Sequence, residues 1–134
     1  MIFAHINMSK CDGIELLSKG MNEWMHKGNN RKAIVYFDKA IKLDRTLYWV
    51  FYGKGMALFF MNNLKEAEKC LKMVVKLHKT HAAAWSNLAG IQERLGKKRE
   101  AKKSREMAHL TNKTHNEEVK RRNQKPREKR VLHT

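Results

Sequence analysis

One spacing constrains this chain more than any other feature: residues of the same kind return every 34 positions. Alanine recurs at Ala33, Ala67 and Ala101. A bulky apolar residue recurs at Leu17, Phe51 and Trp85, and a turn-forming residue at Gly28, Asn62 and Gly96. A period near 34 residues is typical of stacked helical hairpins, each of which buries its apolar side against the next. The sequence therefore predicts an all-α chain of three hairpins, at about residues 14–47, 48–81 and 82–115.

Apolar residues at helical spacing divide each hairpin into two helices. The predicted helices cover residues 13–27, 30–43, 47–61, 64–77, 81–95 and 98–111. Residues 1–12 show no clear period and are expected to form an irregular lead-in. Four residues of helix-capping type, also 34 apart, are expected to precede helices: Asp12, Thr46, Thr80 and Thr114. The last of them is expected to start a capping helix that stops before Pro126.

The composition argues against several kinds of site. Cys11 and Cys70 form no CxxC pair, so we expect neither a disulfide framework nor a zinc site. His78 and His81 have a spacing that can hold a metal ion, but no third ligand stands near them in the sequence. The sequence has no glycine-rich phosphate loop and no nucleophile elbow. We therefore expect no metal, no cofactor and no enzymatic activity.

The sequence also bears on location. No apolar run is long enough to span a membrane. The start of the chain lacks the basic leader and the cleavage pattern of a secretory signal. We expect a cytoplasmic protein, or a nuclear one if the source has a nucleus.

Positive charge is concentrated in the last third of the chain. The sequence contains 29 lysine and arginine residues against 13 acidic ones, and 15 of the basic residues fall within 82–134. Such a surface can attract nucleic acid or an acidic protein, and it can equally be a solvated face. The candidate phosphate-binding residues are Lys97, Lys98, Arg99, Lys102, Lys103, Lys120, Arg121 and Arg122. Residues 115–134 are expected to be a basic, partly disordered extension.

Over residues 13–114 the repeated positions resemble the tetratricopeptide repeat family. The alanine set stands where that family brings paired helices close together, and the bulky apolar set stands where it places a large residue. The resemblance implies a right-handed superhelix of three helix-turn-helix hairpins. The sequence departs from the family at Met21, where a small residue is usual. It also departs where the usual proline is replaced by Arg45, Lys79 and Lys113.

The resemblance further implies a concave face, built from the first helix of each hairpin, that binds a peptide or helix of another protein. By the family's phase, the predicted groove residues are Asn22, Met25, Trp49, Tyr52, Met56, Phe59 and Ser86. The four from the middle hairpin are spaced by three, four and three, which places them on one helix face. The alternative interpretation is that these aromatic side chains pack into the core.

One class of ligand is disfavoured. Some family members hold a C-terminal carboxylate with a set of lysine, asparagine and arginine residues. Only Asn22 matches that set, and the other positions hold Ser18, Gly53, Ala83 and Asn87. The leading hypothesis is therefore a non-catalytic scaffold for protein–protein interaction. The alternative is an adaptor that binds nucleic-acid phosphates through its basic last third. Self-association is compatible with both, and the sequence does not identify the partner.

Overall fold

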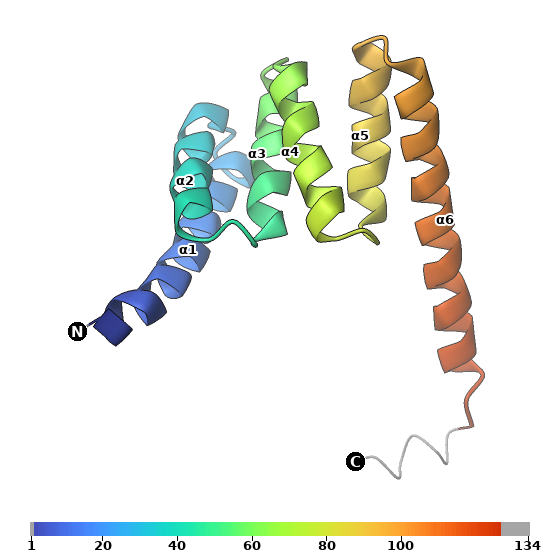
Figure 1. Cartoon of the computed structure of the whole chain (residues 1–134), viewed down its shortest axis with the longest axis horizontal. Coiled ribbons are helices and arrows are strands. Elements are labelled where there is room, and N and C mark those ends of the chain that lie inside the picture. The colour runs from blue at the N-terminus through green and yellow to red at the C-terminus, as the bar shows by residue number, and fades with distance from the viewer. Residues whose placement is uncertain (1, 127–134) are drawn as a thin grey trace.

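Helices alone make up the fold within residues 2–126, the part of the chain that the computed structural model describes; for residues 2–11 it describes the backbone only. The helices are α1 (Ile2–Met25), α2 (Asn30–Leu43), α3 (Tyr48–Phe60), α4 (Leu64–Leu77), α5 (Ala82–Arg94) and α6 (Lys98–Asn123). They stand side by side in chain order, and α1–α2, α3–α4 and α5–α6 form hairpins (Figure 1). The predicted all-α architecture and the pairing of its helices are confirmed.

The turn inside each hairpin contains a residue with left-handed backbone conformation. Gly28 has a φ of 64°, Asn62 of 61° and Gly96 of 78°. Glycine and asparagine adopt this conformation with the least strain. The N–H of Asn63 then donates to the carbonyl of Leu58 over 2.9 Å, which closes the end of α3. The three turn residues are the set that recurs every 34 positions, so the predicted turns are confirmed.

The core lies between neighbouring helices. Ala33 and Ala67 are fully buried and Ala101 nearly so, as expected where helix axes approach closely. One group of buried residues centres on Leu71 and Leu88, and it joins the second hairpin to the third.

A second buried group centres on Phe37, which is clamped between two glycines. A Cβ atom added at Gly20 of α1 would lie 2.5 Å from Cε1 of the ring. A Cβ added at Gly53 of α3 would lie 2.6 Å from its Cζ. Both helices thus present bare backbone to the ring. The small residue that the sequence lacks at Met21 is supplied one position earlier, by Gly20.

Helix α1 begins earlier than predicted. It starts at Ile2, so residues 2–12 are helical rather than an irregular lead-in, and Asp12 lies inside the helix instead of capping it. No proline or glycine occurs in residues 2–12. Once a helix is nucleated, each further residue adds a hydrogen bond at little cost, so it continues until something stops it.

Helix α6 extends further than predicted for the same reason. It runs without a break through Thr114 to Asn123, so the separate capping helix is wrong. The Thr114 hydroxyl donates to the carbonyls of Leu110 and Thr111, over 3.2 and 2.9 Å. Such bonds are typical of a threonine within a helix. Residues 127–134, part of the predicted extension, lie outside the described residues.

The two remaining cap predictions are also wrong. Helix α3 follows Leu47 and α5 follows His81, so Thr46 and Thr80 lie in the turns before these caps. The hydroxyl and the N–H of Thr46 both donate to Oδ1 of Asp44 instead. Threonine serves turns as readily as caps, so its recurrence every 34 positions marks the junction between repeats but not the first residue of a helix.

Candidate peptide-binding face

The predicted groove residues lie on α1, α3 and α5, the first helix of each hairpin. The side chain of Trp49 is 46% exposed and that of Met25 is 63% exposed. Tyr52, Met56 and Phe59 are half-buried, and Asn22 and Ser86 are exposed. All seven residues therefore reach the surface to some extent, as a binding face requires.

Five rings form an aromatic cluster where the start of α3 meets the loop between α4 and α5: Tyr48, Trp49, Tyr52, His78 and His81. Tyr52 stacks on His81 with ring centroids 5.1 Å apart, and Trp49 meets the same histidine edge-on at 5.4 Å. Tyr48 meets His78 edge-on at 4.7 Å. The cluster joins α3 to the loop between α4 and α5. Sequence analysis treated the two histidines as a weak metal pair and missed this role.

His81 also holds the start of α5. Its Nδ1 accepts a hydrogen bond from the N–H of Ala84 over 3.1 Å, which requires that nitrogen to be unprotonated. Burial, helped by the neighbouring His78, lowers the pKa of His81 below its ordinary 6.5. The neutral ring is therefore the form that fits the folded chain, and it both caps α5 and supports Tyr52.

Tyr52 is tied to the third hairpin at a second point. The side-chain amide of Asn87 on α5 donates to the Tyr52 hydroxyl over 3.1 Å. Trp49 lies edge-on to the Tyr52 ring at 5.9 Å. These are the contacts that bring predicted residues of the face together. Asn87, which sequence analysis noted only as a replaced carboxylate-binding position, serves here to fix the tyrosine.

The other end of α3 exposes further apolar side chains. Phe60 is 62% exposed and lies 6.5 Å from the ring of Trp24 on α1. Phe59 contacts Phe60, and the guanidinium carbon of Arg94 on α5 lies 5.0 Å from the Phe59 ring centroid. Neither Phe60 nor Arg94 is among the groove residues predicted from the sequence. The signal for Phe60 was the composition of α3, which is apolar on nearly every side.

Small residues of α5 lie on the same side of that helix as Asn87 and Arg94, which contact Tyr52 and Phe59 of α3. Ala83 and Ser86 are exposed, and a Cβ added at Gly90 would meet no atom within 4 Å. The face therefore combines large side chains on α3 with open space beside Gly90. That arrangement can accept side chains from a bound segment.

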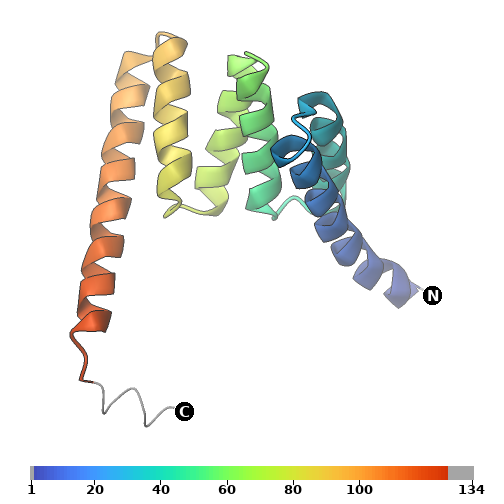
Figure 2. The same cartoon turned by 180° about the vertical axis from the view of Figure 1, so that it is seen from behind.

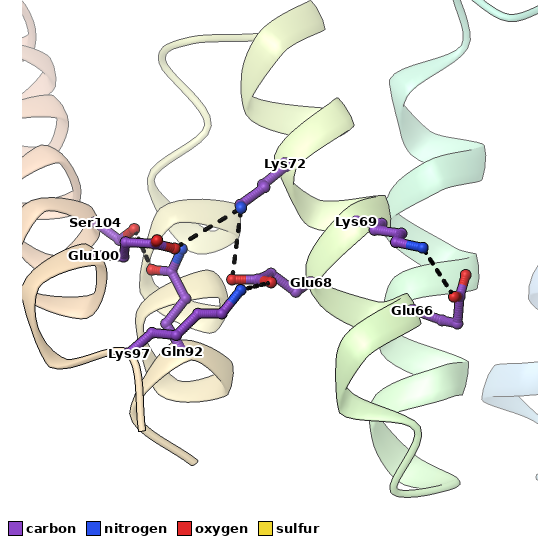
Figure 3. A network of polar contacts seen from close by, with 8 residues as sticks. All are labelled: Glu66, Glu68, Lys69, Lys72, Gln92, Lys97, Glu100 and Ser104. Atoms are coloured by element: carbon purple, nitrogen blue, oxygen red, sulfur yellow. Dashed lines mark hydrogen bonds and ion pairs between the residues drawn. The ribbon is translucent and has the colours of Figure 1, made fainter. Parts of the chain in front are cut away.

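The basic residues of the last third are not equivalent. Nζ of Lys97 lies 2.7 Å from Oε1 of the buried Glu68, and Lys72 lies 3.7 Å from its Oε2 (Figure 3). Burial raises the pKa of Glu68, but the bond from Lys97 and the charges of Lys72 and Lys97 outweigh it, so the pKa lies below 4.5. Lys97 is thus engaged in holding α4 to the third hairpin, which sequence analysis did not foresee.

The other predicted phosphate-binding residues lie on α6. All are exposed: Lys98, Arg99, Lys102, Lys103, Lys120, Arg121 and Arg122. Within residues 12–126, the ion pairs formed by α6 are Arg105 with Glu93, at 2.6 Å, and Glu100 with Lys72, at 3.8 Å. Apart from Arg122, the predicted cations of α6 therefore have no acidic partner among these residues.

The described part of the chain contains neither a candidate metal site nor a candidate membrane span. No group of three or more histidine, cysteine or acidic side chains there is arranged to hold a metal ion. None of the helices described there combines the length and the apolar character needed to cross a membrane.

Comparison with known proteins identifies the repeat. The model of the tetratricopeptide repeat family matches residues 25–47 and 50–81. The matched part of the chain consists of tetratricopeptide repeats. The match covers the middle hairpin and the second half of the first, where the turn and alanine positions agree with the predicted period. No curated protein shows a significant sequence match to the chain.

Solved structures that share the fold include tetratricopeptide repeat domains. The second such domain of RPAP3 (Spaghetti), solved with the HSP90 peptide SRMEEVD, is 21% identical, with a TM-score of 0.72. That match covers 78% of this chain and 98% of the RPAP3 chain. The same domain of human RPAP3, solved with the HSP70 peptide SGPTIEEVD, is 22% identical with a TM-score of 0.72, covering 77% and 85% of the two chains. MamA is 24% identical with a TM-score of 0.71, covering 74% of this chain and 57% of MamA.

Proposed function

We propose that this tetratricopeptide repeat protein is a non-catalytic scaffold whose α1–α3–α5 face holds a peptide or helix of another protein. The observation that carries the proposal is Trp49, a large aromatic side chain that is 46% exposed on the middle hairpin. Its ring contacts Tyr48, Tyr52 and His81, so it is already held in place. A pre-positioned aromatic side chain loses little entropy on binding and commonly dominates the energy of an interface.

The bound segment is proposed to offer apolar side chains rather than an acidic C-terminus. RPAP3 domains have been solved with peptides that end in EEVD. In this chain, the positions that hold a carboxylate in the family carry Ser18, Gly53, Ala83 and Asn87, none of which is a cation. Gly53 is also covered by the Phe37 ring, and Asn87 is engaged with Tyr52. Apolar side chains of a bound segment fit the exposed apolar side of α3, which extends from Trp49 to Phe60.

A peptide selection tests this proposal. Peptides selected by display on the full-length chain would be measured by fluorescence anisotropy against wild type, Trp49→Ala and Val35→Ala. Val35 is the matched control, because it is an apolar residue on α2 that is 52% exposed but lies off the face. Trp49→Ala should weaken binding by more than tenfold, corresponding to about 2 kcal/mol, with little change in melting temperature. Val35→Ala should bind like wild type.

The acidic peptide SRMEEVD provides the second arm. It should bind no more tightly than a scrambled peptide of the same composition, because Ser18, Gly53, Ala83 and Asn87 supply no cation at the positions that hold a carboxylate in the family. Tight and sequence-dependent binding of SRMEEVD would refute the proposed ligand chemistry. An equal loss of selected-peptide binding in Trp49→Ala and Val35→Ala would refute the proposed face.

A second function is proposed for α6, the binding of phosphates. It is supported by the exposed cations of this helix, six of which have no acidic partner within residues 12–126: Lys98, Arg99, Lys102, Lys103, Lys120 and Arg121. Unpaired and solvated cations release counterions when they meet a polyanion, and this release favours binding at moderate salt. This surface is separate from the α1–α3–α5 face, so both functions can coexist.

A further inference from the structure

Helix α6 is about twice as long as each of the four helices before it. It has 26 residues, whereas α2 to α5 have 13 or 14. Its first half is anchored by a buried face: Ala101, Ser104, Ala108 and Thr111. Every residue from 112 to 126 is exposed. Both views show the second half of α6 running on beyond the end of α5 (Figures 1 and 2). The second half of α6 is therefore an exposed rod that projects beyond the end of α5.

One line of basic residues runs along the length of α6. Lys98, Lys102, His109, Lys113 and Lys120 are spaced by four, seven, four and seven. At 100° per residue they fall within about 60° of the helix circumference, on the side away from the buried alanines. The line spans 22 residues, or about 33 Å at 1.5 Å per residue. All five side chains are exposed. We refer to these five residues as the α6 ladder.

Acidic residues lie beside the ladder. Glu106 follows Lys102 by four positions and Glu117 follows Lys113 by four, and both are exposed. Neither forms an ion pair within residues 12–126, so the lysines remain available to a partner. Their negative charge opposes the approach of a polyanion, so neutralising them should strengthen its binding.

The surroundings of the ladder favour one class of partner. A lipid surface needs an apolar helix face to insert, and the exposed apolar residues of α6 are the isolated Leu110 and Val119. A stable protein interface needs aromatic or apolar anchors, and α6 contains no tryptophan, tyrosine or phenylalanine. The same lack of aromatic rings removes the stacking on which single-strand binding depends.

Double-stranded nucleic acid can bind such a helix through charge alone, without an apolar face or aromatic rings on the protein. Its phosphates lie at fixed positions along a stiff duplex, and a straight helix holds its cations at fixed positions too. Little ordering is then required when they meet. We propose that the α6 ladder docks double-stranded nucleic acid through its backbone phosphates, independently of base sequence. This inference rests on the phosphate-binding function proposed for α6 and assigns it a partner.

The test measures binding of the full-length chain by fluorescence anisotropy across a range of salt concentrations. The probes are a DNA duplex, an RNA duplex of equal length and a poly(dT) single strand. The ladder variant is Lys102→Gln, Lys113→Gln and Lys120→Gln combined. The matched control removes the same charge from exposed lysines of α2 and α4 that form no ion pair within residues 12–126: Lys39→Gln, Lys65→Gln and Lys76→Gln.

The ladder variant should bind either duplex at least tenfold more weakly at moderate salt. Loss of three phosphate contacts should also reduce the slope of log affinity against log salt by about three. The control should retain both the affinity and most of the slope. Glu106→Gln should bind the duplex more tightly than wild type. The two duplex arms distinguish DNA from RNA as the source of the phosphates.

Three outcomes would overturn the inference in distinguishable ways. Equal weakening of the ladder and control variants would show that net charge, and not α6, governs binding. Binding of poly(dT) as tight as that of either duplex would refute the duplex but keep the phosphate-binding function. Absence of binding to every nucleic-acid probe at low salt would refute both, and capture by anionic vesicles instead would assign the cations to a lipid surface.

Discussion

Replacement of Gly53 by alanine tests how the first two repeats pack. The side chain of Phe37 is fully buried, and its ring fills the space between α1 and α3. A Cβ on Gly53 would lie 2.6 Å from Cζ, 3.0 Å from Cε2 and 3.1 Å from Cε1 of that ring. The ring has little room to retreat, because it also packs against Gly20 of α1, where a Cβ would lie 2.5 Å from Cε1 and 2.7 Å from Cδ1. The added methyl group must therefore push α3 away from α2 or force Phe37 from its rotamer.

The magnitude follows from two opposing effects. Alanine is favoured over glycine within a helix by about 1 kcal/mol, whereas overpacking a filled core costs about 3 kcal/mol at the upper end of its usual range. Gly53→Ala should therefore destabilise the chain by about 2 kcal/mol, which corresponds to a melting temperature lower by about 8 °C.

The control is Gly90→Ala, because a Cβ there meets no atom within 4 Å. Gly90→Ala should gain only the preference of alanine over glycine in a helix, with no overpacking, and should raise the melting temperature by about 2–4 °C. Thermal unfolding followed by far-ultraviolet circular dichroism measures both changes. A Gly53→Ala variant that melts at or above the wild-type temperature would show that the Phe37 ring does not fill the space against Gly53.

Three further predictions concern α6 and two titrating side chains. Ending the chain after Asn116 should remove little more helix than the deleted residues, because residues 112–126 are all exposed; a larger loss of circular-dichroism signal would show that this part of α6 is docked. The lowered pKa of His81 means that the unfolded chain binds the proton first, so stability should fall as the pH drops below 6.5, and His81→Asn should lack this component in urea titrations. The lowered pKa of Glu68 means that its contribution is present above pH 4.5 and is lost as the pH falls through the lowered value; Glu68→Gln should flatten that part of the stability profile.

The hairpins could be predicted from sequence because their determinants are local and repeated. Gly28, Asn62 and Gly96 have positive φ in the structure, and only a few residue types tolerate that conformation. The alanines at 33, 67 and 101 are buried because two helix backbones pass close to each of them. Only one or two residue types fill each of these sets, so the period is visible without an alignment.

The helix ends could not be predicted because capping residues carry an ambiguous signal. Thr114 and Asp12 have the side chains of N-caps, yet both lie inside helices. A cap matters only where the preceding backbone leaves the helix, and no residue near either position makes it do so. The sequence therefore indicated where one repeat meets the next but missed that α1 and α6 extend beyond the repeats.

The contacts of the candidate site depend on neighbouring repeats and were missing from the prediction. Helical spacing placed Tyr52 on the predicted face, but its partners Asn87 and His81 come from the next hairpin, 35 and 29 positions away. Tyr52 therefore both faces the proposed ligand and holds α3 to α5, so its replacement by alanine would weaken binding and stability together. Trp49 reaches further into solvent. Replacing Trp49 can therefore separate the effect on binding from the effect on stability. The Trp49 ring is supported by Tyr52 and His81, but its removal does not break the hydrogen bond between Tyr52 and Asn87.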